Sequence, residues 1–289
     1  MKQKYGILID SSCTYTNELI KSNKIEIVPL IITNKQTNES VPDTSIAYEQ
    51  LIKNLNAGQR YSTSCSVLGT LIEKAKEMLT KYEHVFFLPI SHGISSQYAN
   101  ALMIKDDFGD SFHVICSTTT GIGNEFLLNK LITLTKKDLK PNEIVAIVTK
   151  ELDYITTYFS CEQIAEMRSG GRLKQLMLKT INFFHKKPII CFNSTNHVVG
   201  FGANFEINLL KMIKHLSKKS FHLETLTNSV ANIGLYVSGH NKLEIDVMLS
   251  LLSNKFQFDK KQIIVRNVPY AILTHTLPKA YGFCVELKH

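Results

Sequence analysis

The chain has 289 residues, of which 44% are hydrophobic and 20% charged, a composition that can fill one large core or two ordinary ones and excludes a disordered chain. Its net charge of +8 comes almost entirely from lysines that are scattered and not interleaved with aromatic residues, so we expect no nucleic-acid partner. No apolar run approaches the roughly 18 residues of a membrane-spanning helix, and the run before Asp10 is too short for a signal-peptide core, so we expect a cytoplasmic protein without an integral membrane segment.

The first half of the chain alternates short apolar runs with segments of helical spacing, which is typical of a doubly wound α/β domain. Pro29 marks an irregularity inside the second apolar region. The apolar runs predict strands at residues 6–9, 24–33, 85–90 and 113–116, and the spaced segments predict helices at 17–21, 46–56, 68–82, 124–135 and 142–155.

The second half opens with a glycine-arginine turn at residues 167–173 and then repeats strands and helices. We expect an α/β fold of two domains: residues 1–155 with a Rossmann-like parallel sheet, and residues 156–289 as a smaller α/β domain. The predicted strands are 158–162, a hairpin of 188–193 and 197–201, 232–238, 263–265, 271–274 and 281–286, and the predicted helices are 173–184, 205–216 and 243–254.

Hydroxyl-rich loops follow three predicted strands of the first domain, at residues 10–12, 91–96 and 117–120. In a parallel sheet such loops gather at the carboxyl edge, where α/β proteins bind their ligands. The segment 62–66, which reads S-T-S-C-S, opens a helix and could join them. We therefore expect a ligand site at this edge, with helix capping as the alternative role of the hydroxyls.

The loop at 91–96 places Ser95 and Ser96 at the start of a predicted helix in which Tyr98, Ala101 and Leu102 share one face. The first turn of a helix has unsatisfied N–H groups and a partial positive charge, which favour an anion or a carboxylate. Alternatively, one of the two serines only caps the helix. Both interpretations stand on the residues alone.

Two further residues are candidates for binding. Arg172 follows two glycines, so its planar side chain could face a carboxylate or phosphate, or could form a surface ion pair. His275 comes directly after the predicted strand 271–274 and before Pro278, where it could hold a ligand or a structural hydrogen bond.

Motifs of catalysis and of cofactor binding are missing from the sequence. Gly121-Ile122-Gly123 begins like a dinucleotide fingerprint but has no third glycine where the pattern needs it, and no phosphate loop or G-x-S-x-G elbow is present. The ten histidines and six cysteines have no metal-ligand spacing. We expect no catalytic residue, no metal and no cofactor; a small-molecule hydrolase or transferase with a two-domain cleft is the alternative.

Six short motifs stand in order along nearly the whole chain: I-D-S-S at 9–12, T-S at 63–64 with Gly69 further on, S-S-Q-Y-A-N-A at 95–101, R-S-G-G-R-L at 168–173, K-P-I at 187–189 and T-H-T-L-P-K-A-Y-G at 274–282. They resemble the T-D-S-T/S, T-S-Q-P-S, S-G-T-Y-Q-S-A, R-R-G-G-R-I, K-P-I and T-H-T-G-P-G-A-x-G motifs of the DegV family. These are fatty-acid-binding proteins that serve bacterial fatty acid kinase.

The resemblance implies two α/β domains with a long-chain fatty acid in a tunnel between them. It also implies a lipid-binding subunit that is not itself an enzyme and that presents the carboxylate to a fatty acid kinase, which forms an acyl phosphate for phospholipid synthesis. The carboxylate would be bound by Thr63 and Ser95, beside Ser64 and Ser96, with Arg172, His275 and Thr276 near the head group.

The sequence departs from the family pattern at four places. Ser96 replaces a glycine, Cys65-Ser66 replaces Gln-Pro, and Leu277 and Lys279 replace the two glycines beside His275. The last two replacements remove backbone freedom where an acyl phosphate would be accommodated. The pattern therefore supports carboxylate binding more fully than the phosphorylation step.

Overall fold

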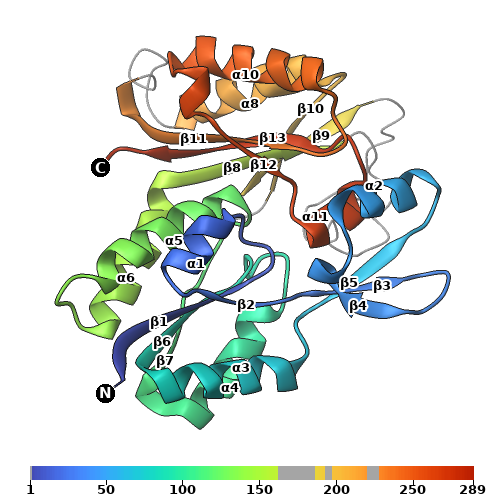
Figure 1. The fold of residues 1–289 in the computed structure, drawn as a ribbon. Helices are drawn as coiled ribbons and strands as arrows, with labels where there is room; N and C mark the ends of the chain where they lie inside the picture. Colours follow the sequence, from blue (N-terminus) through green and yellow to red (C-terminus); the bar gives the residue numbers. More distant parts are fainter. Residues whose placement is uncertain (1, 162–185, 193–196, 220–227) are drawn as a thin grey trace. The chain divides into compact units, whose positions relative to one another are not determined.

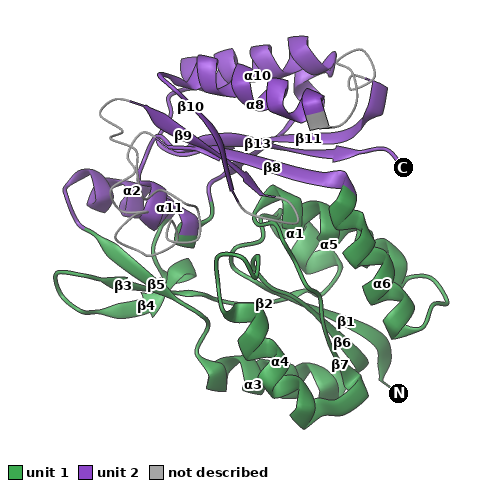
Figure 2. Ribbon diagram, turned by 180° about the vertical axis from the view of Figure 1, so that it is seen from behind, with its two compact units in different colours: residues 1–47, 60–153, 269–271 green, residues 48–59, 154–268, 272–289 purple. Residues whose placement is uncertain are grey.

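The computed structural model describes residues 2–161, 186–192, 197–219 and 228–289. The chain forms two compact units, coloured separately in Figure 2: unit 1 comprises residues 1–47, 60–153 and 269–271, and unit 2 comprises residues 48–59, 154–268 and 272–289. The domain boundary expected after residue 155 stays a prediction. Within the described ranges, no helix is both long and apolar enough to span a membrane.

Unit 1 is built on a parallel sheet of four strands in the order β2-β1-β6-β7, as expected for a Rossmann-like domain (Figure 1). The carboxyl-terminal halves of β1 and β6 are fully buried, which explains their continuous apolar runs. Helices α3 and α4 cover one face of the sheet, and α5 and α6 cover the other. The bounds are β1 Gln3–Asp10, α1 Asn17–Ser22, β2 Glu26–Val28, α3 Leu68–Lys81, β6 Tyr82–Leu88, α4 Gln97–Phe108, β7 Phe112–Val114, α5 Ile122–Thr135 and α6 Pro141–Glu151.

A second, antiparallel sheet of unit 1 has the strand order β4-β3-β5, with β3 at Ile31–Asn34, β4 at Ser40–Pro42 and β5 at Tyr61–Ser64. The strand region expected at residues 24–33 thus consists of two strands, β2 and β3, which belong to different sheets. Pro29 separates them, and it has no N–H group to continue the β2 ladder.

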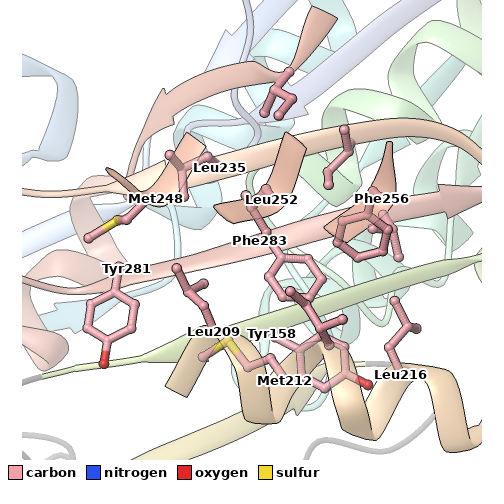
Figure 3. Close-up of a cluster of buried hydrophobic side chains, with 14 of the residues drawn as sticks. Tyr158, Leu209, Met212, Leu216, Leu235, Met248, Leu252, Phe256, Tyr281 and Phe283 are labelled. Carbon is pink, nitrogen blue, oxygen red and sulfur yellow. The ribbon is translucent and has the colours of Figure 1, made fainter. Parts of the chain in front are cut away.

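Unit 2 contains a six-stranded sheet in the order β10-β9-β8-β13-β11-β12, in which only β11 and β12 are parallel neighbours. The predicted hairpin is confirmed as β9 and β10. Figure 3 shows the core, where Tyr158 and Phe283 of the sheet meet Met212 of α8 and Leu252 of α10. The bounds are α2 Tyr48–Asn56, β8 Ile155–Ser160, β9 Lys187–Phe192, β10 His197–Gly202, α8 Phe205–Lys219, β11 Val230–Val237, α10 Lys242–Phe256, β12 Ile264–Asn267 and β13 Tyr281–Leu287.

The strand predicted at residues 271–274 is wrong, because these residues lie in helix α11, Tyr270–Thr276. A short apolar run such as A-I-L does not distinguish a strand from a buried helical turn. The helix ends at Leu277, which has a φ of 60° and donates its N–H to the carbonyl of Leu273. Short 3₁₀ turns complete the described structure: η1 Asp43–Ser45, η2 Gly109–Ser111, η3 Leu152–Tyr154 and η5 Lys260–Gln262.

Candidate functional site

The loops that follow β1, β6 and β7 are joined by backbone hydrogen bonds at the carboxyl edge of the parallel sheet. Gly121 donates its N–H to the carbonyl of Ser12 at 2.9 Å, and Ser91 donates to the carbonyl of Thr119 at 3.0 Å. The strands that carry these loops are neighbours, so the loops form one continuous rim, as the sequence predicted.

Asp10, the last residue of β1, fixes the loop that contains Ser95. Its side chain is fully buried; one carboxylate oxygen accepts the N–H of Ile90 at 2.6 Å, and the other accepts the N–H and the hydroxyl of Ser12 at 3.0 and 2.6 Å. Burial raises the pKa of Asp10 to about 6, although these hydrogen bonds act in the opposite direction. Asp10 therefore joins the β1 and β6 loops from inside the unit.

Ser95 lies two residues before the start of the α4 helix, and its hydroxyl oxygen accepts the N–H of Gln97 at 3.2 Å. It thus provides part of the helix cap that was one interpretation of the sequence. A hydroxyl group accepts through its lone pairs and donates through its hydrogen, so capping leaves the donor function of Ser95 intact. The side chain is half-buried, and its oxygen lies 3.7 Å from the sulfur of Cys65.

Thr63 lies in strand β5, opposite Ile32 of β3. Side chains alternate along a strand, and Thr63 and Cys65 are both half-buried whereas Ser64 between them is exposed. Cys65, which contacts Ser95, follows Thr63 by two residues, just after the end of β5. Within unit 1, the segment that carries Thr63 thus meets the Ser95 loop at Cys65, while Ser64 and Ser96 are both exposed.

Gln97 joins these two segments to each other, a role that the sequence analysis did not predict. It is fully buried; its Oε1 accepts the N–H of Ser66 at 3.1 Å, and its Nε2 donates to the hydroxyl of Ser66 at 2.8 Å. The predicted helix is present as α4, and its buried face runs through Gln97, Ala101 and Ile104, while Leu102 is 39% exposed. Gln97, Ala101 and Ile104 have the spacing i, i+4, i+7 of one helix face, so the sequence predicts this face if a polar residue is allowed on it.

The hydroxyl-rich loop at residues 117–120 has a structural role. The hydroxyl of Ser117 donates to Oδ1 of Asn124 at 2.7 Å and accepts the N–H of Thr119 at 3.1 Å. Asn124 in turn donates to the carbonyl of Pro89 at 3.1 Å, which holds the start of α5 against the end of β6. Through these hydrogen bonds the loop stabilises the rim and the end of β6.

The remaining predicted residues lie elsewhere in the chain. His275 and Thr276 belong to unit 2, where both are buried in α11 and the hydroxyl of Thr276 donates to the carbonyl of Ile272 at 3.1 Å. Arg172 lies outside the described residues. In the part of the chain that the structure describes, no cluster of three or more metal-ligating side chains occurs. The candidate site of unit 1 thus presents neutral hydroxyl groups at a helix N-terminus, an arrangement suited to a carboxylate.

Comparisons with known proteins agree on one family. A family model described as an uncharacterised protein of the DegV family matches residues 4–288. Among curated proteins, a DegV domain-containing protein of Ureaplasma parvum is 26% identical over 286 residues, which cover 99% of this chain and 96% of that protein. One from Mycoplasma pneumoniae is 26% identical over 223 residues, or 75% of each chain.

Solved structures match over nearly the full chain. A structure described as fatty acid binding of a DegV family protein from Thermus thermophilus has a TM-score of 0.83 at 16% identity and covers 99% of this chain and 100% of that chain. A fatty acid binding protein from Bacillus subtilis has a TM-score of 0.81 at 18% identity, with 99% and 100% covered. A stearic acid-binding protein from Eubacterium ventriosum has a TM-score of 0.83 at 16% identity, with 98% of each chain covered. At these identities the likeness shows that the fold is shared.

Proposed function

Since the chain belongs to the DegV family, we propose that it binds one long-chain fatty acid and that Thr63 and Ser95 hold its carboxylate. The observation that carries this proposal is the convergence of the two hydroxyl-bearing segments, seen in the 3.7 Å contact between Cys65 and Ser95 at the N-terminus of α4. Solved relatives that are described as fatty acid binding support the choice of ligand. Ser64, Ser96, Arg172, His275 and Thr276 stay predicted head-group residues.

The tail of such a ligand would supply most of the affinity. Burial of about 14 methylene groups at ~0.8 kcal/mol each gives roughly 11 kcal/mol, from which association and chain ordering subtract several kcal/mol or more. The hydroxyl groups of Thr63 and Ser95 would then decide which end of the ligand lies at the rim, because each can donate one hydrogen bond to a carboxylate oxygen.

We further propose that the protein presents this carboxylate to a separate fatty acid kinase, which forms an acyl phosphate for phospholipid synthesis. The neutral donors Thr63 and Ser95 suit this role, since they would orient the carboxylate while leaving its charge available for attack on phosphate. The kinase would supply the catalysis and would use a phosphoryl donor of the cytoplasm, where we place the protein.

Native mass spectrometry of the purified protein, followed by organic extraction, tests the binding proposal. We expect one fatty acid per chain, carried through purification or taken up from added oleate or palmitate. A protein that is empty and takes up neither would refute the proposal. The presentation step is tested with a kinase subunit and ATP by trapping the acyl phosphate with hydroxylamine, where the protein without kinase should give no product.

A further inference from the structure

Three buried residues of unit 1 form a closed ring of hydrogen bonds beside the candidate site. The hydroxyl of Ser11 donates to Oδ2 of Asp43 at 2.8 Å, the N–H of Leu30 donates to the oxygen of Ser11 at 2.9 Å, and the N–H of Asp43 donates to the carbonyl of Leu30 at 2.8 Å. Ser11 follows strand β1, Leu30 precedes β3, and Asp43 follows β4. The ring therefore joins the parallel sheet to the antiparallel sheet.

Both carboxylate-binding residues are connected to this ring through short paths. Leu30 directly precedes Ile31 and Ile32, the residues of β3 that lie opposite Ser64 and Thr63. On the other side, Ser11 follows Asp10, whose carboxylate holds the N–H of Ile90 at the start of the loop that carries Ser95. A displacement of the ring would thus move Thr63 against Ser95.

Asp43 is the residue of the ring whose charge can change. Its side chain is fully buried, and its second oxygen, Oδ1, has no hydrogen-bond partner among the described residues. A buried carboxylate with one oxygen left unpaired is costly in its charged form. The same oxygen costs less when the group is protonated and neutral.

We propose that Asp43 is a positioning residue for the ligand site, which through Ser11 and Leu30 sets the place of Thr63 relative to Ser95. The inference rests on the proposed fatty acid site. When Asp43 is neutral, the ring closes as observed; when it is charged, its unpaired oxygen draws it toward water, and the ring opens. Affinity for the ligand should then be higher with the neutral group.

The surroundings of Asp43 place the ionisation of its carboxyl group close to neutral pH. Burial is the main cause that raises the pKa of Asp43 to about 7, and the nearby carboxylate of Asp10 raises it further, against the hydrogen bond from Ser11 and the smaller effects of the backbone N–H groups of Thr44 and Asp43. Tyr15, ahead of helix α1, also interacts with Asp43 and is itself an acid whose pKa is raised by burial and then by its neighbours. Asp10 and Tyr15 are both acids, which are either neutral or negative, so neither of them stabilises a negative charge on Asp43.

The first measurement needs no ligand. Amide NMR of the wild-type protein between about pH 5.5 and about pH 8.5, on either side of the pKa of about 7, should show the N–H signals of Leu30 and Thr63 shifting together with the carboxyl carbon of Asp43. In Asp43→Asn, which keeps the shape and an acceptor for Ser11 but cannot ionise, the signal of Thr63 should stay constant. A Thr63 signal that is constant in the wild type, or that shifts equally in the variant, would overturn the inference.

The second measurement follows the affinity for oleate by displacement of the fluorescent fatty acid cis-parinarate over the same pH range. Wild type should lose about fivefold or more in affinity as the pH rises, which is the lower end of usual coupling between two sites, and Asp43→Asn should not. The ionisation of oleate itself affects both proteins alike, so only the difference between them counts. Asp138→Asn, at an exposed carboxylate paired with Lys4, is the matched control and should follow the wild type.

The two measurements separate the inference from the proposed function. If the wild type binds no fatty acid while Thr63 still titrates with Asp43, the proposed function fails and the link between ring and strand stands. If oleate binds with the same pH dependence in wild type and Asp43→Asn, the inference fails and the proposed function stands.

Discussion

Replacing Ser95 by alanine separates the two roles that its hydroxyl group has in the structure. As a donor to a charged carboxylate it should contribute about 1.5–3 kcal/mol to binding, so Ser95→Ala should weaken affinity for oleate about 10- to 150-fold. As the acceptor of the Gln97 N–H, at 3.2 Å, it also caps α4, and its loss should lower the free energy of unfolding by about 1 kcal/mol. Displacement of cis-parinarate measures the first effect, and urea unfolding measures the second.

The matched control is Ser62→Ala, because Ser62 is exposed on strand β5, next to Thr63. It should change neither quantity by more than about 0.5 kcal/mol. A double-mutant cycle of Thr63→Val and Ser95→Ala then asks whether both hydroxyls bind one carboxylate, in which case their effects on affinity should not add. A lower free energy of unfolding for Ser95→Ala with unchanged affinity would refute the reasoning, since the serine would then be a helix cap alone.

Three further predictions concern the structure that supports the site. Gln97→Met removes both bonds to Ser66 and leaves a buried N–H unpaired, so urea unfolding should show a loss of about 2–4 kcal/mol; a loss near zero would mean that water replaces the amide. Because the folded pKa of Asp43 is about 7 against 3.8, the folded state binds its proton more tightly and stability should fall as the pH rises from about 4 to about 7. Asp43→Asn should flatten that slope in unfolding series at several pH values, and an unchanged slope would contradict the assignment. Gly282→Ala should prevent folding of unit 2, since the added Cβ would lie 2.0 Å from a backbone carbonyl oxygen of β8. The control is Gly69→Ala in helix α3, where an added Cβ meets nothing within 4 Å; it should raise the stability by about 0.5–1 kcal/mol in thermal unfolding. Equal effects of the two substitutions on stability would contradict this packing.

The parallel sheet of unit 1 could be predicted because the carboxyl-terminal halves of its two central strands are buried on both faces, and such segments are continuous apolar runs. The assignments that failed are those for which local pattern is ambiguous. Residues 271–274 form one helical turn, too short for a period to show. Pro29 was recognised as irregular, but the choice between one bent strand and two sheets depends on partners far away in sequence.

The candidate site shows the same contrast between residues in local sequence patterns and residues whose role depends on a remote partner. Thr63 and Ser95 could be proposed from the sequence because each belongs to a motif that can be read locally. Gln97 and Asp43 were not found, because a polar residue becomes a core residue only through a partner that is remote in the chain: Ser66 for Gln97 and Ser11, 32 residues away, for Asp43. Burial of a polar group is decided by long-range pairing, for which composition and periodicity have no signal.

The loop after α11 shows how far binding and presentation can be separated. Leu277 and Lys279 stand where the family motif has glycine, yet they adopt φ angles of 60° and 71°, in the left-handed region that glycine adopts without strain. Each costs about 1–2 kcal/mol, and the cost is offset within unit 2: Leu277 is buried, the N–H of Lys279 donates to the carbonyl of Ser238 at 2.7 Å, and its ammonium group pairs with Glu244 at 2.6 Å. The replacements therefore keep a conformation available to glycine but remove the freedom to leave it. A ligand site needs only the fixed conformation, whereas a step that remodels this loop would have to break the pair with Glu244, so any difference between this chain and glycine-bearing relatives should appear in the rate of phosphorylation and not in the affinity for the fatty acid.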